Sequence, residues 1–412
     1  RIPTVQRLGP WLYNLWQDAA NPRGLWRRTT LAQYRKPAPA WETVLDLDAL
    51  GRAEGENWVW GGAQVLGPAY RKALLMLSRG GADAKVVREF DLVDKRFVES
   101  GFVVPEAKTE VDWIDDDHVY VASDFGPGSL TDSGYPRVVR HWRRGQALAD
   151  AKVVFEGEAA DVAVYTFVDR TPGFERTGFG RHVGFYDSRL FLLQGDALQP
   201  VDKPLDASLS FWRERLLLQL RSDWAVAGRL WPRGSLLVAD AAAYLRGERD
   251  FTALFTPTPT RSLESWTTTR RRIVLEVLDN VGSRLEAWQP GADGWQRRDI
   301  AAPRNAQLSV AALHDPLLAD DPLAEHYWLR ASGFLEPETL LLGRSDDDDL
   351  ERLKSLPAFF DARGLQVEQR FATSKDGTRV PYFVIGPKQP RTDGRNPTLL
   401  YGYGGFEVSL TP

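Results

Sequence analysis

The chain has 412 residues and a formal net charge of −4, with 43% hydrophobic and 26% charged residues. That length allows two ordinary domains, or one large repeat domain with an attachment, and the composition is that of a globular protein. The charge gives no basic footprint, so nucleic acid is not expected as a partner. No apolar run approaches the roughly 20 residues needed to span a bilayer, so no membrane segment is expected either.

Cysteine is absent from the chain. Disulfides, thiolate nucleophiles and Cys-based zinc sites are therefore excluded. This composition fits cytoplasm and periplasm alike, and we leave the compartment open with the cytoplasm favoured over the periplasm. The chain begins with Arg1 and not with Met, so the lack of a targeting segment carries no information.

Short apolar or alternating runs recur through the first part of the chain, whereas helical periodicity is scarce. The 15 Trp, 35 Gly and 26 Pro fit many short strands joined by tight turns. The runs form seven groups of three or four predicted strands, at 11–47, 58–103, 111–156, 162–201, 207–239, 262–300 and 307–342. In the fourth group the strands are predicted at 162–168, 182–186, 190–193 and 198–201.

This rhythm, about 50 residues per group, is typical of propeller blades. We therefore predict an all-β fold, a seven-bladed β-propeller, although no blade carries a repeated Trp-Asp or Gly-His signature. The alternative is a pair of β-sandwich domains, which would need a clear linker in mid-chain, and none is evident.

The pattern changes after the seventh group. Four successive aspartates, Asp346 to Asp349, begin a segment that we interpret as a turn-like break and not as a metal site, since adjacent carboxylates rarely converge on one ion. We expect residues 1–363 to form the propeller and 364–412 a second unit. There, Asp376-Gly377 predicts a hairpin, and the apolar run from Thr398 to Tyr401 predicts a buried strand of an α/β sheet.

A serine hydrolase of the α/β type needs a nucleophile in a Gly-x-Ser-x-Gly turn, followed by an acid and a histidine. No serine fits: the nearest partial match, Gly343-Arg344-Ser345, has Asp347 where the second glycine belongs. The five histidines all fall in the propeller-like region and form no zinc-binding pair. Neither a metal nor a cofactor is expected.

The run Tyr401-Gly402-Tyr403-Gly404-Gly405-Phe406 has the character of a catalytic loop. Glycines after a strand let the backbone approach a reacting centre, and a tyrosine hydroxyl there can donate a hydrogen bond to a developing oxyanion. Taken alone, the same pattern also fits an ordinary turn.

The surrounding segment resembles the start of the peptidase domain in the prolyl oligopeptidase family of serine peptidases. The residues that carry this resemblance are Ser374-Lys375-Asp376-Gly377-Thr378, Pro381, Phe383-Val384-Ile385, Asp393-Gly394, Pro397, Leu400 to Phe406 and Thr411-Pro412. The β-rich body, with its passage Gly333-Phe334-Leu335-Glu336-Pro337, resembles the seven-bladed propeller of the same family.

The resemblance implies that 364–412 are the first strands of an α/β-hydrolase domain. It also implies that Tyr403 completes the oxyanion hole and that Phe406 is an aromatic wall of the pocket that accepts proline. The serine, aspartate and histidine of the family lie beyond the position of Pro412, so this chain alone should be inactive. Its partners would be short peptide substrates and the remainder of the peptidase domain.

We therefore expect the substrate-gating propeller of a prolyl oligopeptidase-like serine peptidase that hydrolyses short peptides after proline. The alternative is a noncatalytic propeller that binds peptides or proteins, with its last strands as a structural appendage. A propeller glycosidase is a third class, which would need converging carboxylates in the channel. In the gene, Gly-x-Ser-x-Gly and then Asp and His after Pro412 would favour the peptidase, and an immediate stop codon would favour the scaffold.

Overall fold

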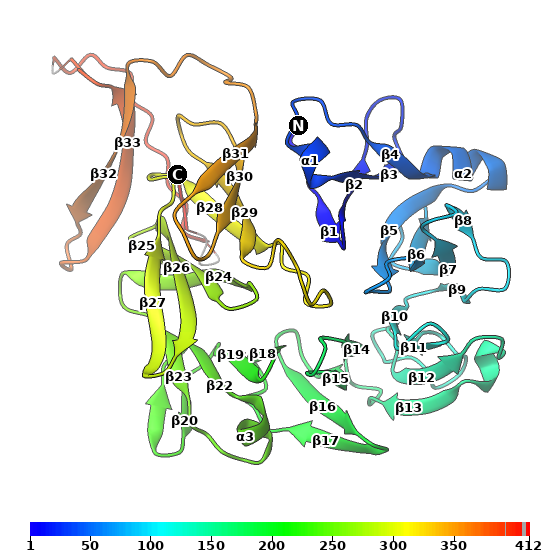
Figure 1. Cartoon of the computed structure of the whole chain (residues 1–412). Coiled ribbons are helices and arrows are strands. Elements are labelled where there is room, and N and C mark those ends of the chain that lie inside the picture. Colours follow the sequence, from blue (N-terminus) through cyan, green and yellow to red (C-terminus); the bar gives the residue numbers. More distant parts are fainter. Residues whose placement is uncertain (392, 406–408) are drawn as a thin grey trace.

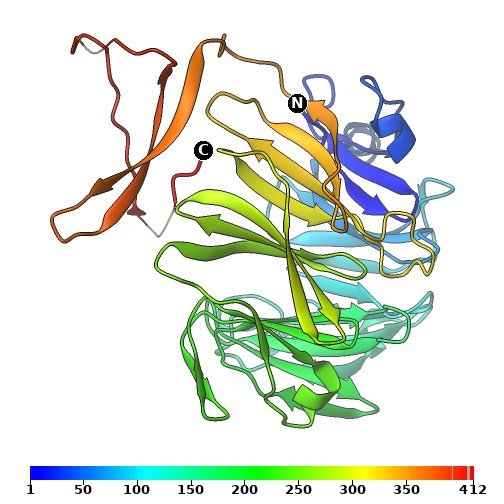
Figure 2. The ribbon, with the colours of Figure 1, turned by 60° about the vertical axis from the view of Figure 1, so that its left-hand side comes forward.

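The computed structural model describes residues 1–391, 393–405 and 409–412. Its strands form seven sheets arranged in a ring, in which the first sheet lies beside the last (Figure 1). A two-stranded hairpin follows the seventh sheet and stands outside the ring (Figure 2). The predicted seven-bladed β-propeller is confirmed, and the two-sandwich alternative is wrong.

The first three blades are antiparallel sheets of consecutive strands. Blade 1 contains β1 (Gln6–Leu8), β2 (Trp11–Trp16), β3 (Leu25–Thr30) and β4 (Glu42–Asp46). Blade 2 contains β5 (Trp58–Val65), β6 (Lys72–Arg79), β7 (Lys85–Asp91), β8 (Arg96–Phe97) and β9 (Val103–Ala107). Blade 3 contains β10 (Glu110–Trp113), β11 (His118–Ala122), β12 (Val138–Arg143) and β13 (Lys152–Glu156). In blade 2, both β8 and β9 pair with β7.

Blades 4 to 7 repeat this plan, with one inserted hairpin. Blade 4 contains β14 (Ala163–Asp169), β15 (Arg176–His182), β16 (Ser188–Gln194) and β17 (Ala197–Val201). Blade 5 contains β18 (Ser208–Trp212), β19 (Arg215–Gln219), β22 (Leu236–Asp240) and β23 (Thr252–Phe255), with the hairpin β20 (Trp224–Val226) and β21 (Arg229–Trp231) inserted. Blade 6 contains β24 (Arg261–Thr268), β25 (Ile273–Asp279), β26 (Gly282–Gly291) and β27 (Gly294–Ile300). Blade 7 contains β28 (Gln307–Ala312), β29 (His326–Ser332), β30 (Thr339–Arg344) and β31 (Leu350–Ser355).

Helices are short and lie in connections between strands. Within the residues that the structure describes, the named helices are α1 (Leu31–Tyr34), α2 (Leu47–Glu54), α3 (Ala241–Leu245) and the 3₁₀ turn Leu148–Asp150. The Asp46 carboxylate caps α2 by accepting a hydrogen bond from the N–H of Ala49 (2.8 Å). The helix ends at Gly55, whose φ of 68° lies in the left-handed region that favours glycine. No helix in the described residues is long and apolar enough to cross a bilayer.

The apolar core lies between neighbouring blades. Each of the seven neighbouring pairs, including blades 7 and 1, shares a cluster of buried apolar side chains. In β11, Val119 and Val121 pack with blade 2, whereas Tyr120 and Ala122 pack with blade 4. Successive side chains of a strand point to opposite faces, so a middle strand needs an apolar residue at every position to serve two neighbours.

The strand predicted at 182–186 is wrong. Residues 176–182 form β15 instead, and 183–187 connect it to β16. Gly178 and Gly180 lower the strand propensity of β15. The rings of β14 fill the space that the glycines leave, since a Cβ at Gly178 would lie 2.2 Å from Phe167, and one at Gly180 only 2.0 Å from Tyr165. Packing between neighbouring strands therefore decides the position of β15.

The segment interpreted as a break after Asp346 continues blade 7. Residues 350–355 form β31, which pairs with β30 as the outermost strand. Its Glu351 and Arg352 are exposed, as suits a strand that faces solvent. The chain then runs to the hairpin, β32 (Leu365–Thr373) and β33 (Arg379–Pro387). The domain boundary predicted between 363 and 364 falls in this connection and stays a prediction.

Candidate functional site

The predicted catalytic loop follows the hairpin. Tyr403 is 52% exposed, and a Cβ at Gly405 would lie 3.1 Å from the Tyr403 hydroxyl. The glycine thus lets the tyrosine ring fold back over the loop. Phe406, the predicted wall of the proline pocket, lies outside the described residues.

The buried strand predicted from Thr398 to Tyr401 is not formed. These residues have irregular backbone, and the side chains of Leu399 and Leu400 are 90% and 95% exposed. A strand needs neighbours that accept its backbone hydrogen bonds and cover its side chains. The described part of the chain supplies neither at this position.

The hairpin itself matches its prediction. Its strands pair from Leu365 with Pro387 to Thr373 with Arg379, and Gly377 in the turn has a φ of 88°. Exposed apolar side chains line both strands: Phe371, Val380, Tyr382, Val384 and Ile385. The hairpin thus presents an apolar surface that the described residues leave uncovered.

The register of blade 7 defines two faces of the ring. Gln307, where the innermost strand begins, lies at the same end of the sheet as Ser355, where the outermost strand ends. The chain leaves the ring at this end, which we call the hairpin face. The Gln369 side chain of β32 donates a hydrogen bond to the carbonyl oxygen of Asn280, in a turn of blade 6 on this same face. The opposite end, where the innermost strands finish, is the far face.

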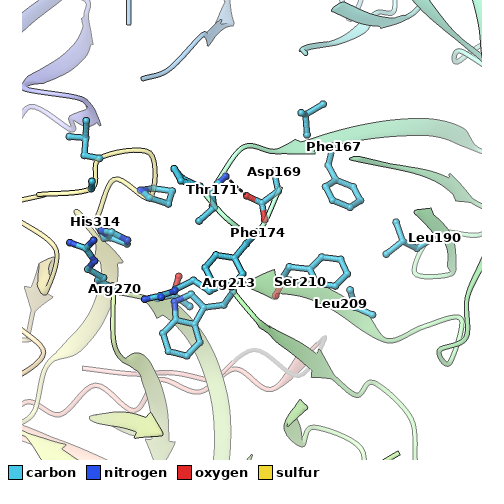
Figure 3. Close-up of a pocket in the computed structure, with 18 of the residues that line it drawn as sticks. Phe167, Asp169, Thr171, Phe174, Leu190, Leu209, Ser210, Arg213, Arg270 and His314 are labelled. Carbon is cyan, nitrogen blue, oxygen red and sulfur yellow. Dashed lines mark hydrogen bonds between the residues drawn. The ribbon is translucent and has the colours of Figure 1, made fainter. Parts of the chain in front are cut away.

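A cavity of about 770 Å³ lies at the far face between blades 4, 5, 6 and 7. Phe167 of β14, Leu190 of β16 and Leu209 of β18 line its apolar side. Arg270, which follows β24, and His314, which follows β28, line its polar side. Figure 3 shows Arg270 and His314 together at one end, with Phe167, Leu190 and Leu209 at the other. A cavity of this size suits a small molecule or a short peptide segment.

Positive charge is concentrated at the polar end. Burial lowers the pKa of His314, and the hydrogen bond from its ring to Asp321 (3.2 Å) opposes this effect only in part. The imidazole is therefore neutral near pH 7, so the positive charge comes from Arg270 and from Arg213, whose guanidinium lies 3.7 Å from the Glu214 carboxylate. Asp169 accepts a hydrogen bond from the N–H of Thr171 (2.9 Å) and lies 3.5 Å from the Arg176 guanidinium, so its charge is already compensated.

Side chains close the ring, because blades 1 and 7 share no strand. Arg7 of β1 donates hydrogen bonds to both carboxylate oxygens of Asp321 (3.0 and 2.7 Å) and to the carbonyl of Leu313 (2.6 Å). The two charged side chains are 8% and 0% exposed. Nearby, Asp315 accepts hydrogen bonds from the N–H of Gly9 and the hydroxyl of Tyr70. The bonds from Arg7 and Gly9 tie the end of β1 to the segment that follows β28, and the bond from Tyr70 ties the connection between β5 and β6 to the same segment.

The pKa of Asp321 reflects this closure. Burial alone would raise it, but the hydrogen bonds from Arg7 and from the N–H groups of Asp315 and Leu323 hold it at about 2. The carboxylate is charged at neutral pH and acts as one half of a buried ion pair.

No histidine in the described part of the chain hydrogen-bonds a serine hydroxyl. The five lie in the propeller, at His118, His141, His182, His314 and His326. The described residues also contain no group of three or more His, Cys, Asp or Glu that could hold a metal ion.

Comparison with known proteins places this geometry in a family. The model of the prolyl oligopeptidase N-terminal β-propeller domain matches residues 1–172. The chain is 38% identical to an uncharacterized peptidase of Sinorhizobium fredii over 409 residues, which are 97% of the chain. A post-proline cleaving enzyme from Rickettsia typhi, 28% identical, matches 100% of the chain with a TM-score of 0.85. The chain belongs to the prolyl oligopeptidase family.

Other matches are consistent with this family and fold. An uncharacterized peptidase of Rickettsia prowazekii is 30% identical over 98% of the chain. Oligopeptidase B from Leishmania major, 16% identical, has the same fold over 99% of the chain with a TM-score of 0.69. The chain spans 55% of the Sinorhizobium protein, 57% of the R. prowazekii protein and 61% of the R. typhi structure. It thus carries the propeller domain of this peptidase family.

The family prediction from the C-terminal motif is confirmed, whereas the roles of Tyr403 and Phe406 stay predictions. The far-face cavity was missed by sequence reasoning. Its lining comes from strand ends in four blades, such as Phe167, Leu209 and Arg270, and no local pattern brings them together.

Proposed function

We propose that this chain is the substrate-gating propeller, with the first strands of the α/β-hydrolase domain, of a serine peptidase that hydrolyses short peptides after proline. The observation that carries the proposal is the match over the whole chain with the post-proline cleaving enzyme of R. typhi. That match includes the hairpin and the loop that contains Tyr403. The propeller alone is not expected to catalyse the reaction.

The exposed apolar hairpin supports the proposed division into 1–363 and 364–412. A two-stranded hairpin is at best marginally stable in water without cover. The exposed apolar residues of β33 and the nearly fully exposed Leu399 and Leu400 together form a surface that favours burial. In our proposal the remainder of the peptidase domain covers this surface, and the run from Thr398 to Tyr401 then becomes a buried strand.

The closed ring supports the proposed gating role. Neighbouring blades are joined by buried apolar clusters, and the pair formed by blades 7 and 1 also carries the Arg7–Asp321 ion pair. Such a ring stays folded and shields one side of a peptidase site at the hairpin face. Short, flexible peptides would reach that site, whereas folded proteins would be excluded by their size.

In the proposed reaction, a serine beyond this chain attacks the peptide carbonyl and a histidine transfers the proton to the leaving amine. The Tyr403 hydroxyl donates a hydrogen bond to the oxyanion as the tetrahedral intermediate forms. Phe406 offers an aromatic face to the proline ring of the substrate.

The test uses a gene product that continues past Pro412 with Gly-x-Ser-x-Gly and then Asp and His. Tyr403→Phe should lower kcat about 100-fold or more on a fluorogenic peptide with proline before the scissile bond. Tyr382→Phe, which removes a hydroxyl from β33, is the matched control and should leave kcat unchanged. Equal kcat for Tyr403→Phe and the unmodified protein would contradict the assignment, and a gene that stops after Pro412 would favour the noncatalytic scaffold.

A further inference from the structure

The far-face cavity contains a cation that the described residues do not neutralise. The backbone N–H of Arg270 donates a hydrogen bond to the carbonyl of Ala324 (2.8 Å), which fixes the residue beside the cavity. Its half-buried guanidinium has no ion-pair or hydrogen-bond partner within 1–391, 393–405 and 409–412. A partly desolvated guanidinium gains most from a planar anion, because it can donate two parallel hydrogen bonds.

The neighbouring acids are engaged elsewhere. Asp321 is bound by Arg7 and also accepts the hydrogen bond from His314. Asp169 is compensated by Arg176 and lies on another blade. Arg270 can therefore pair with an anion that a ligand brings.

The opposite end of the cavity is suited to an apolar group. Phe167 and Phe211 stack with their ring centroids 6.2 Å apart, beside Leu190 and Leu209. Between the two ends, Ser210 lines the cavity, and its hydroxyl oxygen is buried without a hydrogen-bond partner among the described residues. A ligand that fits all three features has a carboxylate, a polar group beside it and an apolar body.

We propose that the cavity binds the free C-terminus of a peptide that ends in an apolar residue. The α-carboxylate pairs with Arg270, the last amide bonds to the Ser210 hydroxyl, and the terminal side chain lies against Phe167 and Phe211. An alkyl carboxylic acid shares the carboxylate and the apolar body, but it has no amide and leaves Ser210 unpaired. The site lies on the face opposite the hairpin, goes beyond the proposed peptidase function and needs none of its chemistry.

Binding can be measured on the 412-residue chain itself by titration calorimetry. The probe is N-acetyl-Gly-Gly-Phe with a free carboxylate, compared with the same peptide as its C-terminal amide. The acid should bind about tenfold or more tightly than the amide, since only the acid forms a charge-assisted pair. Arg270→Gln should abolish this preference, while Arg271→Gln, which changes the exposed neighbour outside the cavity, should preserve it.

Three results would overturn the inference: equal binding of acid and amide, an equal effect of the two arginine variants, or binding of decanoate with no binding of the peptide acid. Thermal melts of both variants establish that they are folded. Ser210→Ala gives a second test, because it should weaken the peptide acid severalfold and leave decanoate binding unchanged. Because no turnover is measured, failure here would leave the peptidase proposal standing, and failure of the Tyr403 test would leave this site standing.

Discussion

Replacing Arg7 by glutamine should destabilise the ring where it closes. Asp321 is fully buried and Arg7 is its cation, so the substitution leaves a carboxylate without its partner in the interface between blades 1 and 7. The carboxylate keeps the hydrogen bonds from the N–H groups of Asp315 (2.9 Å) and Leu323 (3.0 Å) and from the His314 ring (3.2 Å). The substitution therefore removes only part of the interactions that stabilise the buried carboxylate.

The expected magnitude follows from these contacts. Breaking a buried ion pair by removing one partner costs about 3–5 kcal/mol, and the three remaining bonds place this case at the lower limit, about 3 kcal/mol. An unfolding entropy of about 2.1 cal/mol/K per residue gives about 0.9 kcal/mol/K for a chain of this length, so Tm should fall by about 3–4 °C. Arg35→Gln is the matched control, because Arg35 and Glu351 join the same blades but are 44% and 45% exposed. Its cost should stay below about 1 kcal/mol.

Scanning calorimetry at pH 7 and at pH 3 tests whether the lost ion pair causes the destabilisation. The pKa of Asp321 is depressed to about 2, so the stability from the pair is fully present above its usual pKa and is lost as pH falls towards 2. The deficit of Arg7→Gln relative to the unmodified protein should therefore shrink at pH 3. Equal Tm shifts for Arg7→Gln and Arg35→Gln, or a deficit independent of pH, would refute the reasoning.

Two further predictions concern the core. Burial raises the pKa of Glu276 to about 7 against an opposing hydrogen bond from Ser265, so folded-state stability falls as pH rises from about 4.5 to about 7. Glu276→Gln should then raise the free energy of unfolding by up to about 3 kcal/mol at pH 8 and leave it almost unchanged at pH 4.5, as measured by urea unfolding. A gain in stability at both pH values would show that the buried charge of Glu276 is not the cause. Gly180→Ala should lower the free energy of unfolding by about 1–3 kcal/mol, because its Cβ meets the Tyr165 ring. Gly386→Ala is the control: its Cβ has open space around it, so its stability should lie within about 0.5 kcal/mol of the unmodified protein. Similar losses of stability for the two variants would show that the Tyr165 contact is not the cause.

The strands that sequence reasoning found are mostly those in the interior of the blades. β25 has six buried residues in succession, Ile273 to Leu278, because both of its faces meet other blades. Among the strands that it missed, β31 is outermost, and its exposed Glu351 and Arg352 weaken the apolar pattern, whereas β20 is an inserted strand of only three residues. The middle strand β15 was missed because Gly178 and Gly180 interrupt its apolar run. A strand that is buried on both faces has a continuous run of apolar residues, which is easily recognised in the sequence. A strand that is exposed to solvent lacks this run.

The same contrast holds for the sites. Tyr401 to Phe406 could be singled out because its residues are adjacent in the chain, although the buried strand expected before it is absent from the described residues. Arg270, Phe167 and Leu209 are far apart in sequence, and each by itself has the character of an ordinary strand-end residue. Their shared cavity becomes visible only when four blades are placed around one axis.

The sequence by itself determined the blade rhythm, the all-β class, the hairpin at Asp376-Gly377 and the prolyl oligopeptidase family, because each depends on patterns within neighbouring residues. Tertiary structure alone decided how the ring closes, through Arg7 and Asp321, which are separated by almost the whole propeller. It also decided the position of β15, and it placed the Arg270 guanidinium where no described residue forms an ion pair with it. The physical reason is that burial, ion pairing and cavity shape depend on which residues meet in space, and the order of residues along the chain does not specify those distances.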